Sequence, residues 1–219
     1  MADLSRRTER FRRFDTARVP SPCFVVDRLA IEENLRVLDQ VQRASGARIL
    51  LALKAFAMWK LAPLVARYLH GTCASGLDEA RLGREEFGGE LHTFSAAYSE
   101  RDLAAILEIS DHVVFNSFAQ WERFQPLVRQ ARARRPRLQF GLRATPEPSE
   151  GRNPLYDPCA PFSRLGIPRA QFHGSLAGIS GLHFHTLCED DFSPLARTVA
   201  AFERGFGEFI PGMQWINFG

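Results

Sequence analysis

The sequence contains very little lysine. Of its 28 basic residues only two are lysines, Lys54 and Lys60, and the others are arginines. Each lysine is therefore examined as a possible chemical group. The sequence also lacks an apolar run of the roughly 18 residues that a membrane-spanning helix needs, and its first residues lack the apolar stretch of a secretory signal. We expect a cytoplasmic protein with no membrane partner.

Charge of one sign is not in large excess. The formal net charge is +3, which does not by itself indicate a polyanionic partner. Two arginine-rich stretches, RRTERFRR (6–13) and RQARARRPR (129–137), suggest nucleic-acid binding. However, Thr8 and Glu9 interrupt the first, and the second fits the cationic C-terminal end of a helix. We expect no nucleic-acid partner.

The cysteines are far apart and form no C-x-x-C pair: they are Cys23, Cys73, Cys159 and Cys188. This spacing argues against a zinc ribbon, a thioredoxin-type site and a dense disulfide framework. We expect reduced thiols.

Short apolar runs alternate with longer segments of helical period, a pattern that favours parallel β-α units. The expected strands, most of them roughly twenty residues apart, cover residues 22–27, 48–54, 71–75, 90–95, 112–117, 138–144, 181–185 and 214–218. No G-x-G-x-x-G follows the first strand, which weakens the case for an open dinucleotide-binding sheet. We predict an α/β protein of the (β/α)8 barrel type, with its chemistry where strands end.

Polar residues mark the helix starts after several strands. The expected capping boxes are Ser75 with Asp78, Ser99 with Asp102, and Ser117 with Gln120. Asp27 should cap a helix over residues 28–43, whose Leu35, Leu38 and Val41 would face the core. Residues 145–180, rich in Pro, Gly and Ser, are predicted to form a long loop, and loops of that length are commonly functional.

Lys54 ends the apolar run RILLALK, which we expect to be a strand buried on both faces. Burying an ammonium group without a partner costs several kcal/mol, so such a lysine would have a function. At the carboxyl end of a barrel strand, desolvation would lower its pKa and give a free amine that attacks carbonyl groups. The alternative is that Lys54 lies just beyond the strand and extends to water. Lys60 is expected to be a solvated surface lysine.

A second candidate group is the pair His183 and His185 in GLHFHTLCEDD. We expect one ring to face the barrel interior and the other to face the surrounding helices. An H-x-H pair on a strand can bind metal, but no third ligand at a convincing spacing accompanies it, so no metal is expected. The other interpretations are a packed core histidine and a ring that lies over a flat cofactor.

Several stretches resemble one enzyme family. LLALKAF, GTCASGLDEARLGREEFGGELHTFSAAYS, DHVVFNSFAQWERF, NPLYDPCAPFSRLGI, GLHFHTLCE and WINFG occur in that order and resemble the carboxynorspermidine/carboxyspermidine decarboxylases. This family belongs to the alanine-racemase-like, fold-type III group of pyridoxal-phosphate enzymes. The resemblance implies pyridoxal 5'-phosphate as cofactor. It also implies decarboxylation of carboxynorspermidine or carboxyspermidine to norspermidine or spermidine in polyamine biosynthesis.

The resemblance assigns roles to five residues. Lys54 matches the lysine that binds pyridoxal phosphate covalently, and His185 matches the histidine that stacks on its pyridine ring. Arg143 and Arg164 match arginines near the cofactor's ring oxygen or the substrate carboxylate. Gly219 matches the first glycine of a loop whose backbone amides hold the phosphate, which is typical chemistry for a turn after a late barrel strand.

A polycationic substrate needs carboxylates that pair with its distal ammonium groups. Glu189, with Asp190 and Asp191 beside it, follows His185 closely and is our candidate for this contact. The alternative is that the acidic residues are a helix start favoured by the helix dipole. Family members are homodimers, so the resemblance also implies a homodimer.

The resemblance further implies an incomplete chain, because the sequence stops at WINFG. The eighth barrel strand and the C-terminal β-domain of the family are expected beyond Gly219. We divide the chain into an N-terminal arm (1–20) and a cofactor-binding barrel domain (21–219). The barrel should have seven strands, because residues 22–27 join the β-domain in the family. We expect weak or absent turnover from these residues alone.

Two other functions account for less of the sequence. Ornithine and diaminopimelate decarboxylases share the expected fold, and some single-domain barrels of about this length bind pyridoxal phosphate without catalysing decarboxylation. The stretches HTFSAAYS, NPLYDPCAP and LHFHTLCE favour the carboxynorspermidine branch.

Overall fold

Seven parallel strands form one curved sheet in a computed structural model that describes residues 8–9, 11–147, 156–187 and 191–219. In spatial order they are β1 (Leu50–Ala52), β2 (Gly71–Ala74), β3 (Glu90–Phe94), β4 (His112–Phe115), β5 (Gln139–Thr145), β7 (Gly181–His183) and β8 (Trp215–Asn217). The short strand β6 (Ile167–Pro168) pairs with β5. The predicted number and order of barrel strands are confirmed.

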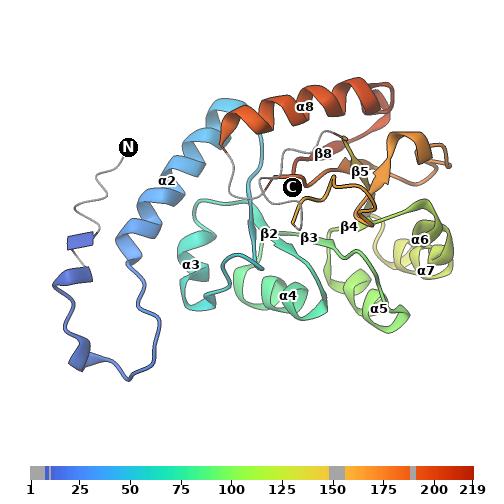
Figure 1. Cartoon of the computed structure of the whole chain (residues 1–219). Helices are drawn as coiled ribbons and strands as arrows, with labels where there is room; N and C mark the ends of the chain where they lie inside the picture. The colour runs from blue at the N-terminus through green and yellow to red at the C-terminus, as the bar shows by residue number, and fades with distance from the viewer. Residues whose placement is uncertain (1–7, 10, 148–155, 188–190) are drawn as a thin grey trace.

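Helices cover the outer face of the sheet; the first precedes β1 and the others follow β1 or later strands (Figure 1). They are α2 (Arg28–Ser45), α3 (Ala62–Val65), α4 (Leu77–Leu82), α5 (Glu100–Ile109), α6 (Phe118–Arg123), α7 (Gln125–Arg134) and α8 (Phe192–Phe206). A π-helical turn, η3 (Gly83–Phe87), extends α4, and short 3-10 turns form η1 (Thr16–Arg18), η2 (Trp59–Leu61), η4 (Arg169–Gln171) and η5 (Gly207–Gly212). Among the described helices, none is both long and apolar enough to cross a lipid bilayer.

The two faces of the sheet differ in chemistry because side chains alternate along each strand. Leu91, Val113, Phe140 and Leu182 point toward the helices and are almost completely buried in the main hydrophobic core. The inner face carries polar side chains, namely Glu90, His92, His112, Gln139, Arg143, His183 and Asn217. Helix packing therefore uses one face of the sheet and leaves the other for chemistry.

A second, smaller core lies where α2 and α3 meet the β1 end of the sheet. Leu35, Leu64 and Phe87 are buried there. The prediction that Leu38 and Val41 also face the core was wrong, because they are 36% and 49% exposed. Helix α2 lies at the margin of the molecule and packs against α3 (Figure 1), so only one side of it is covered.

Three of the four predicted helix caps are present. Asp27, Ser99 and Ser117 each accept hydrogen bonds from first-turn amides of the helix that follows. The fourth prediction was wrong: the hydroxyl and the amide of Ser75 both donate to the carboxylate of Glu79, at 2.8 Å. These contacts satisfy first-turn amide groups that would otherwise lack partners within the helix.

Residues 22–27 do not form the predicted strand. Phe24 is 96% exposed, and this segment has no strand partner among the described residues. A strand forms only where a neighbour satisfies its backbone groups, and apolar composition does not supply one. The predicted loop over residues 145–180 is largely irregular in its described part, where β6 and η4 are its regular elements.

The first part of the arginine-rich stretch, residues 129–134, forms the end of α7, as predicted, and residues 135–137 follow it. Arg132 and Arg135 donate to backbone carbonyls of neighbouring segments, and Arg134 forms an ion pair with Glu108. These three guanidinium groups therefore hold elements of the fold together.

Candidate active site

Two adjoining cavities open near the carboxyl ends of the strands. Their volumes are about 340 and 130 Å³, and five residues line both of them: Lys54, Ser75, Phe94, Arg143 and His185. Each of the five lies at or near the carboxyl end of its strand. Because barrel enzymes place their active sites at this end, we take the shared pocket as the candidate active site.

Lys54 lies in a turn just after β1, and its side chain is exposed. The prediction that it is enclosed at the end of a doubly buried strand was wrong. The ladder ends where the Leu53 amide donates to the Cys73 carbonyl at 3.0 Å, and β1 is an edge of the described sheet with half-buried residues. Lys54 thus lies just beyond the strand, as the alternative interpretation had it, although its side chain still lines the pocket. Lys60 is exposed, as predicted.

His183 and His185 both line the pocket, and their ring centroids are 6.3 Å apart. The prediction that they face opposite sides of the sheet was wrong, because residues two apart on a strand share a face. Burial, together with the charges of Lys54 and Arg143, lowers the pKa of His185 to about 4. Burial also lowers the pKa of His183 well below its usual value. Both rings are therefore neutral at pH 7.

Arg143 is a buried cation in the pocket, with 4% of its surface exposed. Its Nη2 donates to the His185 carbonyl at 2.8 Å, and its guanidinium carbon lies 4.8 Å from the centroid of the Phe94 ring. Burial lowers the pKa of Arg143 to about 10, so it stays charged at neutral pH. No carboxylate in the described part of the chain pairs with it. A buried charge of this kind favours an anionic ligand.

Gly219 packs directly against His185. Its φ is +90°, and a Cβ at this position would lie 2.6 Å from His185 Nδ1 and 2.7 Å from the Phe184 carbonyl oxygen. Its amide donates to Asn217 Oδ1 at 2.8 Å. Both the backbone conformation and the close approach require glycine, so position 219 is built to lie beside the histidine.

Arg164, a predicted substrate contact, does not line the pocket. Arg164 is exposed, because the loop turns so that its carbonyl accepts a hydrogen bond from Asn116 Nδ2 at 2.7 Å and the neighbouring Leu165 faces the larger cavity. Glu189 lies outside the described residues. Asp191 caps α8 by accepting a first-turn amide at 3.0 Å, which agrees with the alternative interpretation of the acidic stretch as a helix start.

Sequence reasoning missed Ser75 and Phe94 as lining residues. Ser75 ends the predicted strand 71–75, and Phe94 is the last residue but one of the predicted strand 90–95, so the rule that placed the chemistry at strand ends could have found them. Cys73 also lines the smaller cavity, and burial raises its pKa to about 11, so it is a thiol at neutral pH. Cys23, Cys73 and Cys159 are free, as predicted.

The curved parallel sheet has the fold of part of the barrel of the alanine-racemase-like, fold-type III decarboxylases. A solved carboxynorspermidine decarboxylase from Campylobacter jejuni, complexed with norspermidine, is 37% identical to this chain with a TM-score of 0.81. The match covers 92% of this chain and 50% of that one. A diaminopimelate decarboxylase from Helicobacter pylori has a TM-score of 0.72 at 14% identity, over 94% of this chain and 53% of that one, which shows the fold alone.

Curated relatives give more specific names. A carboxyaminopropylagmatine decarboxylase from Synechocystis is 39% identical over 202 residues, and a carboxynorspermidine/carboxyspermidine decarboxylase from Campylobacter jejuni is 37% identical over 203 residues. Both matches cover 92% of this chain, which spans about half the length of these relatives, 51% of each. No family model matches the chain. The resemblance to carboxynorspermidine/carboxyspermidine decarboxylases is confirmed.

Proposed function

We propose that this chain carries the cofactor-binding barrel of a pyridoxal-phosphate-dependent carboxy-lyase that converts carboxynorspermidine or carboxyspermidine into norspermidine or spermidine in polyamine biosynthesis. The observation that carries the proposal is the buried Arg143 cation, unpaired by any described carboxylate, in a pocket that it shares with Lys54 and His185. The similarity to named decarboxylases supports the substrate class.

The pocket residues fit pyridoxal phosphate. Arg143 offers a desolvated positive charge to an anionic oxygen, and Gly219 brings backbone close to His185 without a side chain. Lys54 offers a primary amine at the mouth of the same cavity. When bound, the cofactor supplies an electron sink for the carbanion that forms on loss of CO₂. The chain can therefore provide the covalent anchor, the anion partner and the backbone approach that such a cofactor needs.

Each residue then has a separate task. Lys54 would bind the cofactor through its aldehyde carbon, and the exposed position of Lys54 would give the substrate amine access to that carbon. His185 presents a neutral ring, because its pKa is about 4, and so packs against a flat cofactor without adding positive charge. Arg143 orients an anionic group of the cofactor or the substrate. We also propose Arg164 and Glu189 as substrate contacts, supported by the resemblance alone.

A second candidate substrate is carboxyaminopropylagmatine, favoured by the relative that is 39% identical. Like carboxynorspermidine, it joins an amino-acid carboxylate to a cationic chain, so the two substrates make the same demands on the pocket near Lys54. We further propose an arm over residues 1–20, a barrel domain over residues 21–219, a homodimer and a cytoplasmic location. These proposals rest on the resemblance, and for the arm also on the position of residues 11–20, which lie away from the sheet (Figure 1).

Lysine scarcity makes the anchor easy to test. The chain is incubated with pyridoxal phosphate, reduced with borohydride and digested, and the labelled residue is identified by mass spectrometry. We expect the label on Lys54, its loss in Lys54→Arg and its retention in Lys60→Arg, which removes the only other lysine. A label confined to Lys60 or to the N-terminal amine would overturn the proposal.

The substrate class is tested by protection of Lys54. Carboxynorspermidine, carboxyspermidine and carboxyaminopropylagmatine are each added before borohydride, with ornithine and diaminopimelate at equal concentration as comparisons. We expect the carboxylated polyamines to reduce labelling of Lys54 more than the two amino acids do. Equal protection by ornithine would instead favour a general amino-acid decarboxylase.

A further inference from the structure

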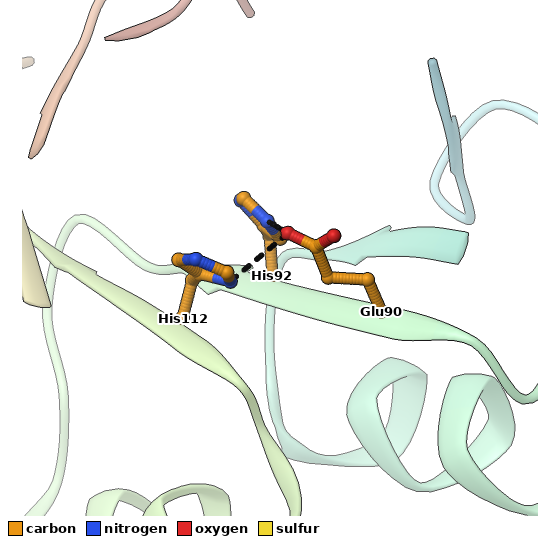
Figure 2. Close-up of side chains that lie close together, drawn as sticks. All are labelled: Glu90, His92 and His112. Atoms are coloured by element: carbon orange, nitrogen blue, oxygen red, sulfur yellow. Dashed lines mark hydrogen bonds and ion pairs between the residues drawn. The ribbon is translucent and has the colours of Figure 1, made fainter. Parts of the chain in front are cut away.

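A second polar cluster lies on the inner face of the sheet, at the amino-terminal ends of β3 and β4 (Figure 2). It consists of Glu90, His92 and His112, and the register places His92 directly opposite His112. The two imidazole rings stack with centroids 3.9 Å apart. His92 Nε2 lies 2.7 Å, and His112 Nδ1 3.3 Å, from the same oxygen, Glu90 Oε1. The three side chains are only 11 to 20% exposed.

One ring nitrogen of His112, Nδ1, has no hydrogen-bond partner in the described structure. Its Nε2–H donates to Gln139 Oε1 at 3.1 Å, and Gln139 Nε2 in turn donates to Gln214 Oε1 at 3.0 Å. In the neutral ring Nδ1 then carries a lone pair. This atom is buried, has no hydrogen bond in the described structure and faces the Glu90 carboxylate. Two electron-rich atoms in contact repel each other unless positive charge lies between them.

We propose that Glu90, His92 and His112 form a binding site for a divalent transition-metal ion of the zinc class. One ligand atom from each residue lies within 4.8 Å of the other two. Ligand atoms around tetrahedral zinc are roughly 3.3 Å apart, given bond lengths of about 2.0–2.2 Å. The His112–Glu90 separation already has this value, and the His92–Glu90 separation needs to widen by about half an ångström.

The donor set selects the class of ion. Two imidazole nitrogens and one carboxylate oxygen suit Zn²⁺ or Co²⁺, whereas Mg²⁺ and Ca²⁺ prefer oxygen ligands. The hydrogen bond from His112 to Gln139 has the form of an outer-shell contact that orients a metal-binding histidine. The ion would bind His92 Nε2, which now donates to Glu90. The ring's proton would then be on Nδ1, and the Asn217 amide, whose Nδ2 lies 3.4 Å from Nδ1, would turn its oxygen toward it.

The position of the cluster gives the ion a route and a role. His92 lines the smaller cavity together with Lys54, so the ion can enter from the candidate active site. The cluster belongs to the opposite ends of the strands from Lys54, so the ion would hold β3 and β4 together beneath the pocket. This inference does not depend on the proposed decarboxylase activity.

Zinc binding is tested by calorimetric titration of the full chain, prepared without a histidine tag. We expect one Zn²⁺ per chain, and dissociation constants at least about tenfold weaker in His112→Gln and Glu90→Gln, since even outer-shell losses cost that much. His173→Gln is the matched control, because His173 is exposed on the loop after η4, and it should bind as the parent does. No stoichiometric binding by the parent, or unchanged binding in both cluster variants, would overturn the proposal.

A spectroscopic measurement on the parent chain decides the question even if a variant misfolds. Co²⁺ bound to the cluster should quench the fluorescence of Trp215, whose ring centroid lies 5.3 Å from that of His112, and quenching should saturate at one equivalent. Its absorption should lack thiolate-to-cobalt bands, because the cluster contains no cysteine. Thiolate bands at one equivalent would place the ion at a cysteine such as Cys73 and refute the assignment.

Discussion

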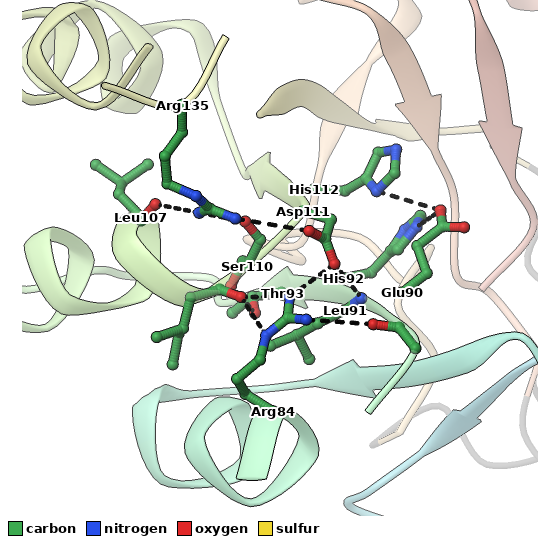
Figure 3. Close-up of polar contacts among 12 residues, drawn as sticks. Arg84, Glu90, Leu91, His92, Thr93, Leu107, Ser110, Asp111, His112 and Arg135 are labelled. Carbon is green, nitrogen blue, oxygen red and sulfur yellow. Dashed lines mark hydrogen bonds and ion pairs between the residues drawn. The ribbon is translucent and has the colours of Figure 1, made fainter. Parts of the chain in front are cut away.

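Replacing Asp111 by asparagine should lower the free energy of unfolding by about 1–2 kcal/mol. This carboxylate, which precedes β4, joins three segments (Figure 3). Its Oδ2 accepts hydrogen bonds from the Leu91 amide at 2.9 Å and from Arg84 Nη2 at 2.7 Å. Its Oδ1 lies 3.6 Å from Arg135 Nη2. Asparagine keeps the shape and one acceptor oxygen but removes the charge that both guanidinium groups face.

The magnitude follows from burial and geometry. A charge-assisted hydrogen bond contributes about 1.5–3 kcal/mol and a neutral one about 1 kcal/mol. Replacing the charged bond between Asp111 and Arg84 by one to an asparagine oxygen therefore costs roughly 1 kcal/mol. The longer contact to Arg135 adds a few tenths, because exposed pairs are screened by solvent and both side chains are about one third exposed. The same two arginines donate to carbonyls at the end of α5, so their displacement would also loosen that helix.

Urea unfolding followed by circular dichroism measures the effect. Glu108→Gln is the matched control, since it removes the carboxylate of an exposed pair with Arg134 and should cost less than about 0.5 kcal/mol. Asp111→Ala should cost about 3 kcal/mol, because it also leaves the Leu91 amide without its partner. If Asp111→Asn were no more destabilising than Glu108→Gln, the half-buried network would contribute no more than an exposed ion pair and the reasoning would fail.

Two further perturbations test the inner face of the sheet. The pKa values of His183 and His185 are lowered in the folded chain, so the unfolded chain binds protons more readily. The free energy of unfolding should therefore be greatest above about pH 6.5 and fall toward pH 4, by up to about 1.4 kcal/mol per pH unit for each histidine. Urea unfolding across that pH range measures the effect. Gly181→Ala places a Cβ 2.1 Å from Trp215 Cδ2 and should lower the free energy of unfolding by about 1–3 kcal/mol by overpacking. The control Gly205→Ala, whose Cβ meets nothing within 4 Å in helix α8, should raise it by about 0.5–1 kcal/mol. Equal effects of the two substitutions in thermal unfolding would contradict the close packing of Gly181 against Trp215.

The strands and their order could be predicted because each apolar run buries a row of side chains under the helices. Val113 and Phe140, for example, lie in runs that the sequence marks as strands, and both are fully buried. The run at residues 22–27 has the same composition but no partner in the described sheet, so it stays unpaired. Hydrophobicity indicates that a segment can be a strand, whereas pairing depends on what lies beside it.

For the site residues, too, the sequence indicates which residues belong to the pocket but not how each of them is placed. Lys54, Arg143 and His185 were predicted from motif resemblance, and the structure brings all three to one pocket. The exposure of Lys54 could not be predicted, because it depends on where the β1 ladder stops and on β1 being an edge. The meeting of His92 with His112 was also not predictable, since it depends on the register between β3 and β4.

The two polar clusters of the inner face differ in whether their charged groups have partners within the described fold. A barrel interior is normally filled by branched apolar side chains, so a polar group there is costly unless another group satisfies it. Glu90 accepts hydrogen bonds within the fold from His92 and Arg48, and these contacts lower its pKa to about 2. Arg143 has no such partner among the described carboxylates, and a fold gains nothing from a buried cation left unpaired. The proposed anionic ligand would pair with that cation, so we expect anion recognition at the Arg143 end of the sheet and the proposed divalent ion at the Glu90 end.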